Sequence, residues 1–208
     1  MTASHANGTS NHTYAVRVTL KKNLPDQRGT HIIGNIHDIG ITSVRKMYTA
    51  NVYYLKFKRE RDETKTAREA ADRIASEILY DPVIEEYEVY TGVTPGGPVG
   101  CSPNCAWSVV ISYLPGVMDT TADTIREAAE VIGVRGLEEV KSGHEYFLCG
   151  EISRKDVEGI VKRLLANPLV EQWYIRTCAS RRTFSLEKQF SGSSVIKKGT
   201  PRGRHYKA

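Results

Sequence analysis

The feature that most constrains this chain is an internal repeat. When the sequence is compared with itself at a shift of 93 positions, Asp26 aligns with Asp119. At a shift of 86 positions, segment 79–85 (Leu-Tyr-Asp-Pro-Val-Ile-Glu) aligns with segment 165–171 (Leu-Ala-Asn-Pro-Leu-Val-Glu). The change of shift corresponds to a loop seven residues longer in the first copy, near the charged run 58–65, and loops accept such insertions at little cost. The repeat predicts two equivalent modules in tandem.

Each module shows the same succession of hydrophobic patterns. A run with apolar residues at every second position predicts a half-buried strand at the start, and apolar residues at helical spacing, followed by glycine, predict the first helix. A second amphipathic helix follows in each module. It is expected to end before Asp-Pro or Asn-Pro, because the residue before a proline disfavours helical geometry. Ser153 and Asp156 form a predicted capping box. The residues that define the four helices are Ile32, Ile36 and Ile39; Ala67, Ala71, Ile74 and Ile78; Ile125, Ala128, Ala129 and Ile132; and Val157, Ile160, Val161 and Leu164.

Between the two helices of each module we expect two short strands, with a turn near Ala50-Asn51 in the first copy and near Gly143-His144 in the second. The resulting order, β-α-β-β-α-β twice, is typical of an α+β fold with ferredoxin-like modules. A module of about 75 residues is marginal alone, so we expect the two sheets to associate, by an edge or by an open face, as an intramolecular pseudo-dimer. The predicted parts are a disordered leader (1–13), the first module (14–90), a Gly/Pro-rich linker (91–106), the second module (107–176) and a basic tail (177–208).

The net charge of +5 is unevenly distributed. From residue 176 onward there are nine lysines and arginines and one acid, so this end carries +8 and the rest of the chain carries −3. A basic tail of this kind suggests a nucleic-acid-binding alternative. RNA-binding sheets of similar topology expose aromatic residues on central strands, and the candidates here are the pairs Tyr53/Tyr54 and Tyr146/Phe147. The leader has no signal-peptide pattern and no segment is long and apolar enough to span a membrane, which favours a cytoplasmic location.

The sequence contains no GxxxxGK[ST], no GxGxxG after a strand, no HExxH and no GxSxG motif. The six histidines do not pair with cysteines or carboxylates at metal-ligand spacing. Cys101 and Cys105 form a CxxxC pair without a second pair of ligands, so we expect no metal site and interpret the four cysteines as free thiols. The composition therefore favours binding over catalysis, with no catalytic residue and no cofactor held by this chain.

The two modules resemble the PurS family, the small subunit of phosphoribosylformylglycinamidine (FGAM) synthase. In the first copy the resemblance rests on Asp26-x-x-Gly29 and on Ile78-Leu79-x-Asp81-Pro82-Val83-Ile84-Glu85. In the second copy Val140-Lys141-Ser142-Gly143-His144 is similar to the family's V-R-x-G-K, and 165–171 to its L-A-N-x-x-I-E. The resemblance covers residues 14–90 and 107–176.

The resemblance implies a role in purine biosynthesis. Members of this family have no active site; they dimerise and bridge the ATP-dependent synthetase PurL to the glutaminase PurQ, so that ammonia passes between them. ATP and Mg²⁺ would then be used by the synthetase, and the tandem would take the place of a PurS dimer, with further self-association possible. The chain is similar also to the front end of longer, single-chain synthetases.

The first copy departs from the family pattern, because Met47-Tyr48-Thr49-Ala50-Asn51 replaces V-R-x-G-K. If those positions contact partner subunits, only the second copy keeps the contact. The candidate partner-binding residues are therefore Asp119, Lys141, Gly143 and His144. Asp119 can also be explained as a helix N-cap and Gly143 as a turn residue with positive φ.

A third interpretation is a tandem small-molecule sensor of similar topology. Its ligands would bind at the interface between the two sheets and would stabilise the protein. The RNA alternative instead predicts salt-dependent binding that disappears when the residues after Arg176 are removed.

Overall fold

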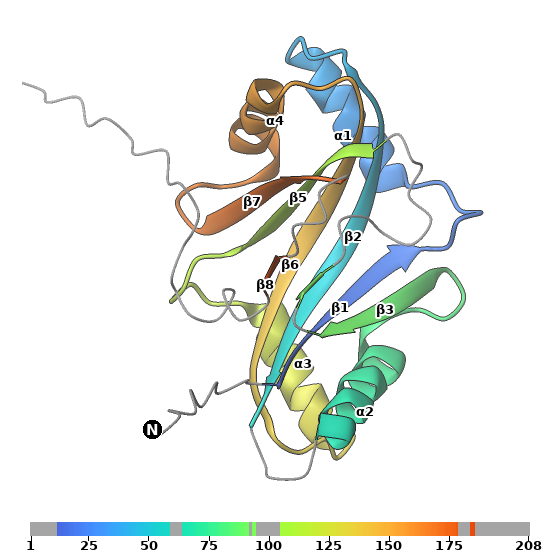
Figure 1. The fold of residues 1–208 in the computed structure, drawn as a ribbon, viewed down its shortest axis with the longest axis vertical. Coiled ribbons are helices and arrows are strands. Elements are labelled where there is room, and N and C mark those ends of the chain that lie inside the picture. The colour runs from blue at the N-terminus through green and yellow to red at the C-terminus, as the bar shows by residue number, and fades with distance from the viewer. Residues whose placement is uncertain (1–11, 59–63, 92, 95–104, 179–183, 186–208) are drawn as a thin grey trace, which may run out of the picture.

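The computed structural model describes residues 12–58, 64–91, 93–94, 105–178 and 184–185 (Figure 1). The first module consists of β1 (His12–Leu20), α1 (Gln27–Asp38), β2 (Val44–Phe57), α2 (Thr64–Ile74) and β3 (Glu85–Thr91). The second consists of β5 (Cys105–Tyr113), α3 (Thr120–Val131), β6 (Leu137–Gly150), α4 (Arg154–Ile160) and β7 (Glu171–Thr177). Helices α2 and α4 each continue into one π-helical turn, Ala75–Leu79 and Val161–Leu165. Two short strands, β4 (Val93–Thr94) and β8 (Phe184–Ser185), pair with each other.

The two modules share one antiparallel sheet of six strands in the order β3-β1-β2-β6-β5-β7. They join through their long strands, because β2 pairs with β6 from Val44↔Gly150 to Phe57↔Leu137. This confirms the α+β pseudo-dimer and decides between the two expected modes of association in favour of the edge. The leader to residue 11, most of the linker and most of the basic tail lie outside the described residues.

The expected turns in the middle of each module are wrong. Ala50 and Asn51 lie within the continuous 14-residue strand β2, and Gly143 and His144 lie within the equally long β6. The two short strands predicted for each module are therefore the two halves of one strand. One half pairs with β1 or β5 of its own module, and the whole length pairs with the other module. In a continuous strand pair of this length, the backbone N–H and C=O groups form hydrogen bonds with the neighbouring strand.

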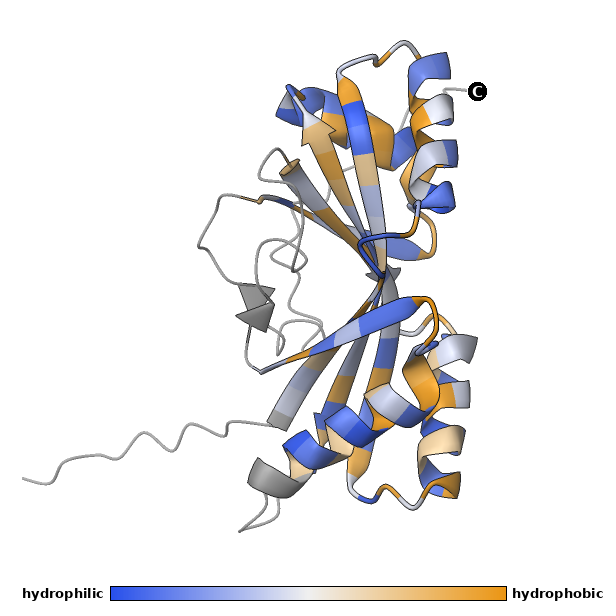
Figure 2. Cartoon of the chain, turned by 90° about the vertical axis from the view of Figure 1, so that its right-hand side faces the viewer, coloured by the Kyte–Doolittle hydropathy of each residue, from blue (hydrophilic) through white to orange (hydrophobic). Residues whose placement is uncertain are grey.

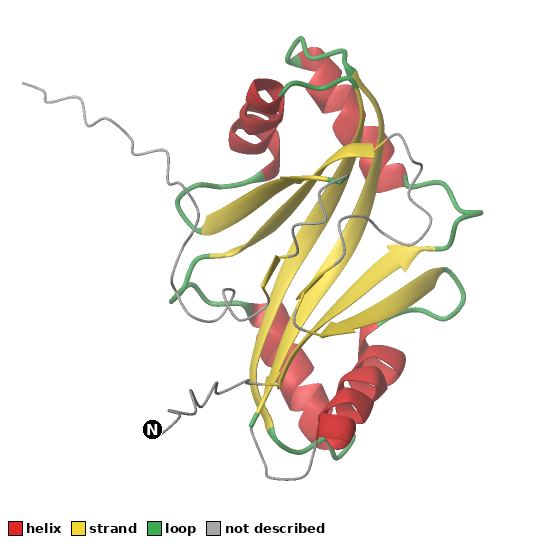
Figure 3. Cartoon of the chain, viewed as in Figure 1, coloured by secondary structure: helices red, strands yellow, loops and turns green. Residues whose placement is uncertain are grey.

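The helices pack across the module boundary. Ile125 and Ala129 of α3 belong to the hydrophobic core formed by β1, by the end of β2 and by α2. In the same way, Ile36 of α1 belongs to the core formed by β5, β6 and α4. Figure 3 shows the resulting helix pairs, α1 with α4 at one end of the sheet and α2 with α3 at the other, and Figure 2 shows the same two-ended arrangement from the side. Because each core needs a helix from the other module, neither module completes its own core.

The repeated segments 79–85 and 165–171 form the same corner. In the first module Asp81 Oδ1 accepts from Val83 N (2.8 Å), while Glu85 Oε2 accepts from Asp81 N (2.8 Å). In the second module Asn167 Oδ1 accepts from Leu169 N (3.1 Å), and Glu171 Oε2 accepts from Asn167 N (2.6 Å). These reciprocal bonds hold the turn between helix and strand, which explains why the motif occurs twice.

Candidate functional site

Asp119 joins the start of α3 to the middle of β6. Its Oδ1 accepts from Ala122 N (2.9 Å), which makes it the N-cap of α3, and its two oxygens accept from Ser142 N (2.7 Å) and Ser142 Oγ (2.8 Å). Asp26 does the same in the first module, where it accepts from Gly29 N at 2.7 Å and from Thr49 N and Oγ1 at 2.6 and 2.9 Å. Each aspartate is therefore a clamp between helix and strand as well as a cap.

The clamps lie on either side of a pseudo-two-fold axis. Asn51 and His144 are equivalent positions at the shift of 93, and they are also direct partners in the β2–β6 register. A residue that pairs with its own equivalent lies on the symmetry axis relating the copies. Across this axis His144 Nδ1 lies 3.1 Å from Asn51 Oδ1.

His144 occupies an environment that disfavours a positive charge. Burial and the neighbouring guanidinium of Arg28 lower the pKa of His144 to about 4, against the opposing effect of Asp119. Arg28 Nη1 lies 3.4 Å from His144 Nδ1, and Arg28 Nη2 donates to Tyr146 Oη at 3.0 Å. The imidazole is therefore neutral at physiological pH. Thr121 takes the position of Arg28 in the second module, so the environment of the axis is asymmetric.

Gly143 is needed for a close approach of strands. A Cβ on this residue would lie 2.5 Å from the carbonyl oxygen of Ile111 on β5. Gly143 lies in β6 and is not among the glycines with positive φ, so its explanation as a turn residue is wrong. The first module has Ala50 at this position, buried and paired with Thr19.

Lys141 lies on the opposite face of the sheet from the Asp119 clamp. Side chains alternate along a strand, so those of Ser142 and His144 share the face of the helices, whereas Lys141 extends from the other face. There its Nζ lies 3.6 Å from Glu139 Oε1. The structure therefore brings Asp119 and His144 together on one face and places Lys141 on the other, although Asp119 and Lys141 both line one hollow at the edge of the sheet.

Two hollows flank the axis at equivalent places, where each long strand continues beyond its neighbour. We name them by charge. The basic pocket, about 580 Å³, is lined by Lys21, Lys22, Arg45 and Lys46 together with Asp26 and Glu86. The acidic pocket, about 460 Å³, is lined by Asp119, Asp123 and Glu139 together with Lys141. A smaller hollow of about 80 Å³ lies at the axis itself, beside Asn51, Gly143 and His144.

A comparison with protein families matches this chain twice. The family model of PurS, described as phosphoribosylformylglycinamidine (FGAM) synthase, matches residues 13–91 and 106–178. The chain belongs to the PurS family. The two matches correspond to the two modules of the shared sheet, and they associate the chain with the small subunit of FGAM synthase in purine biosynthesis. No curated protein matches the chain.

On the face away from the helices, this PurS tandem contains a buried ionic network that we did not predict. Glu145 accepts from Arg17 Nε at 2.9 Å, from Arg176 Nη2 at 2.7 Å and from Ser108 Oγ at 2.5 Å. Arg17 also donates to Tyr90 Oη at 3.1 Å, and Tyr90 contacts Glu88. The side chains of Arg17 and Glu145 are each only 1% exposed. Alternation along the first strand assigns Arg17 to the polar face of a half-buried strand, so the sequence pattern gave no signal for its burial.

The same burial affects the RNA alternative. Tyr54, Tyr146 and Phe147 are 1%, 5% and 0% exposed, so they offer no stacking surface, and Tyr53 packs against the core of the first module. Since a single sheet joins the modules, the space between two sheets in which the sensor hypothesis places its ligand does not exist.

The interpretation of all cysteines as free thiols is wrong for one pair. Cys105 and Cys149 are direct partners in the β5–β6 register and form a disulfide. Cys101, the other half of the CxxxC pair, lies outside the described residues. Cys178 is a free, partly buried thiol, and burial raises its pKa to about 11.

The residues that the structure describes form neither a metal-ligand cluster nor a membrane-spanning helix. These residues contain no group of three His, Cys, Asp or Glu side chains arranged to hold a metal ion. None of their helices is long and apolar enough to cross a membrane. His37, one of the histidines considered above, lies with Nε2 3.0 Å from the carbonyl oxygen of Val44, at the end of α1.

Proposed function

We propose that this chain is the PurS-type subunit of an FGAM synthase complex, and that it bridges the synthetase PurL and the glutaminase PurQ without an active site of its own. In the overall reaction, formylglycinamide ribonucleotide, glutamine and ATP give the amidine, glutamate, ADP and phosphate. ATP and Mg²⁺ are used by the synthetase. The role of this chain is to hold the two partners so that ammonia released at one site reaches the other.

One observation carries the proposal: two PurS matches in one chain form one sheet around a pseudo-two-fold axis. A dimeric bridge has two equivalent surfaces because its interface is isologous. Here the two surfaces are covalently joined, and the exchanged helices α1 and α3 hold them in one orientation. A rigid scaffold of this kind suits a subunit whose work is to position other proteins.

The candidate partner contacts fall into two groups. Asp119 lies beside the axis and His144 on it, both on the helix face, where the clamp and the imidazole hold the middle of β6. Lys141 extends from the opposite face and is mostly covered, with 19% of its side chain exposed. Gly143 acts through the close approach of β5. We therefore propose Lys141 and the surface of the acidic pocket as partner contacts, with Asp119, Gly143 and His144 as positioning residues.

The test is reconstitution with PurL and PurQ from the same organism, in the presence of ATP and glutamine. We expect the three proteins to co-purify and glutamine-dependent synthesis to require this chain. Ammonium chloride in place of glutamine provides the control, because free ammonia does not need a bridge and synthesis by PurL should then depend much less on this chain.

Substitution of Lys141 by Ala separates the contact from the scaffold. We expect weaker co-purification with an unchanged unfolding midpoint, whereas Lys162→Ala, at an exposed position on the π-helical turn after α4, should leave co-purification unchanged. If the three proteins do not associate under any ligand condition, the bridging role is wrong.

A further inference from the structure

The basic pocket differs from its counterpart in a way that points to a ligand. Its lining contains four cations and two carboxylates, whereas the lining of the acidic pocket contains one cation and three carboxylates. The two pockets occupy equivalent places, so the fold alone does not require the reversal of charge. The reversal comes from side chains at the surface, where substitutions are least constrained by packing.

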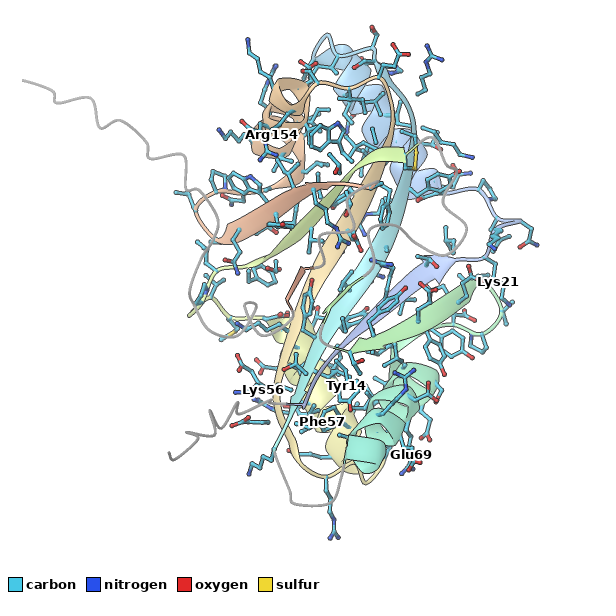
Figure 4. All side chains as sticks on the ribbon, in the orientation of Figure 1. Tyr14, Lys21, Lys56, Phe57, Glu69 and Arg154 are labelled. Carbon is cyan, nitrogen blue, oxygen red and sulfur yellow. A yellow bond between two sulfur atoms is a disulfide. The ribbon has the colours of Figure 1, made fainter. Side chains whose placement is uncertain are left out.

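The cations of the basic pocket come from two separate segments. Lys21 and Lys22 lie in the loop that follows β1, and Arg45 and Lys46 lie at the start of β2. Lys21 Nζ donates to the carbonyl oxygens of Pro82 and Val83 at 2.6 and 3.0 Å, which holds the loop beside the corner before β3 (Figure 4). The register of β2 with β6 shifts between Val44 and Lys46, and such irregularities change the direction of side chains. The two segments therefore present positive charge to one hollow from different directions.

The carboxylate of Asp26 does not neutralise this charge by direct contact with it. Its oxygens accept hydrogen bonds from Gly29 and Thr49. Arg45 and Lys46 are exposed, and Lys46 Nζ lies 4.6 Å from the centre of the Tyr48 ring. The volume of about 580 Å³ lies within the range of roughly 300–1,000 Å³ that is typical of small-molecule sites.

We propose that the basic pocket binds a small phosphorylated anion, with Arg45, Lys46 and Lys22 as the groups that contact its phosphate. The planar guanidinium of arginine and the ammonium group of lysine are the common protein ligands of phosphate. The lining also includes the apolar side chains of Leu24 and Ile33 and the hydroxyl of Thr30, which suit a sugar or another mixed polar and apolar part of the ligand. This inference does not depend on the bridging role, because it concerns a site on the chain by itself.

The test is a titration of the full chain with ribose 5-phosphate at constant ionic strength, followed by calorimetry and by amide NMR. We expect saturable binding, with shifts in the segments around Lys21 and around Arg45. The double variant Arg45→Gln/Lys46→Gln should weaken binding by about tenfold or more, since two charge-assisted contacts are lost. The matched control is Lys162→Gln/Arg163→Gln, which removes the same charge at exposed positions after α4 and should change affinity less than about twofold.

Three outcomes would overturn the proposal. Equal losses of affinity for ribose 5-phosphate in both double variants would mean that binding depends on the overall charge of the protein. Shifts confined to the basic end of the chain would place the binding there. Equal binding of citrate would remove the preference for phosphate, and absence of saturable binding of ribose 5-phosphate would remove the site.

Discussion

The two modules share their internal framework but differ in what they present to solvent. Asp26 with Thr49 and Asp119 with Ser142 make the same clamp. By contrast, the flanking pockets have opposite charge, and the axis carries asparagine on one strand and histidine on the other. Buried polar bonds are costly to lose, whereas surface charges change at little cost to folding. The comparison shows how a duplicated chain can keep a symmetric scaffold while its two surfaces acquire separate roles.

The largest expected difference between the modules concerns the ionic network. Glu145→Ala would leave Arg17 and Arg176 buried without their carboxylate, and we expect a loss of about 3–5 kcal/mol in the free energy of unfolding. At the equivalent position of the first module, Val52→Ala removes only apolar contacts and should cost about 1–2 kcal/mol. Urea unfolding measures both values. Similar losses in the two variants would show that the network contributes no more than apolar packing does.

The next largest losses are expected at the two clamps, and these losses should be equal because the clamps are equivalent. Asp119→Ala and Asp26→Ala each remove a helix cap and leave a strand amide without its acceptor, so each should cost about 2–3 kcal/mol. Urea unfolding of both variants should give values within about 0.5 kcal/mol of each other. A much larger effect at one position would mean that the framework is less symmetric than its hydrogen bonds.

Smaller losses are expected at Gly143 and Ala50, the equivalent positions beside the axis. Gly143→Ala places a Cβ against the Ile111 carbonyl, and we expect it to cost about 1–2 kcal/mol through displacement of β5 from β6. The reciprocal change in the first module, Ala50→Gly, should cost about 0.5–1 kcal/mol through backbone entropy. Thermal unfolding followed by circular dichroism measures both. A neutral Gly143→Ala would contradict the close approach of the strands.

The smallest effect concerns pH. The pKa of His144 is about 4 in the folded protein and about 6.5 in an unfolded chain, so the unfolded state binds more protons between these values. The contribution of the neutral His144 to the free energy of unfolding is fully present above pH 6.5. It is lost as the pH falls from 6.5 to 4. Because the side chain is partly exposed to solvent, we expect no more than about 1 kcal/mol.

The matched variant for this effect is His144→Asn, which makes the axis chemically symmetric with Asn51. Urea unfolding at pH 7 and at pH 5 should show a smaller loss of stability in the variant than in the natural chain. Identical pH dependence in both would mean that His144 keeps an ordinary pKa when folded.

Much of the secondary structure could be read from the sequence. The helix at Ile125–Ile132, the stops before Pro82 and Pro168, and the Ser153 cap all follow from local rules, and the structure confirms them. The turns at Asn51 and His144 could not be excluded locally, because glycine and asparagine are both favoured in turns, whereas glycine also occurs at strand positions that a neighbour approaches closely. Only part of the role of Asp119 could be predicted. Its function as a helix cap was expected, but its bond to Ser142 depends on the distance between helix and strand in the folded chain.

The sequence by itself determined that this protein has two equivalent modules, that they are α+β and that they belong with PurS, because hydrophobic periodicity and repeated motifs are local properties of the chain. Only the tertiary structure decided how the modules meet. The β2–β6 register places Asn51 opposite His144. It also lets α1 and α3 pack in the core of the other module, and it brings Arg17, Glu145 and Arg176 into one buried network. These contacts join residues far apart in the chain, and their free energy depends on burial and distance, which exist only once the sheet has formed.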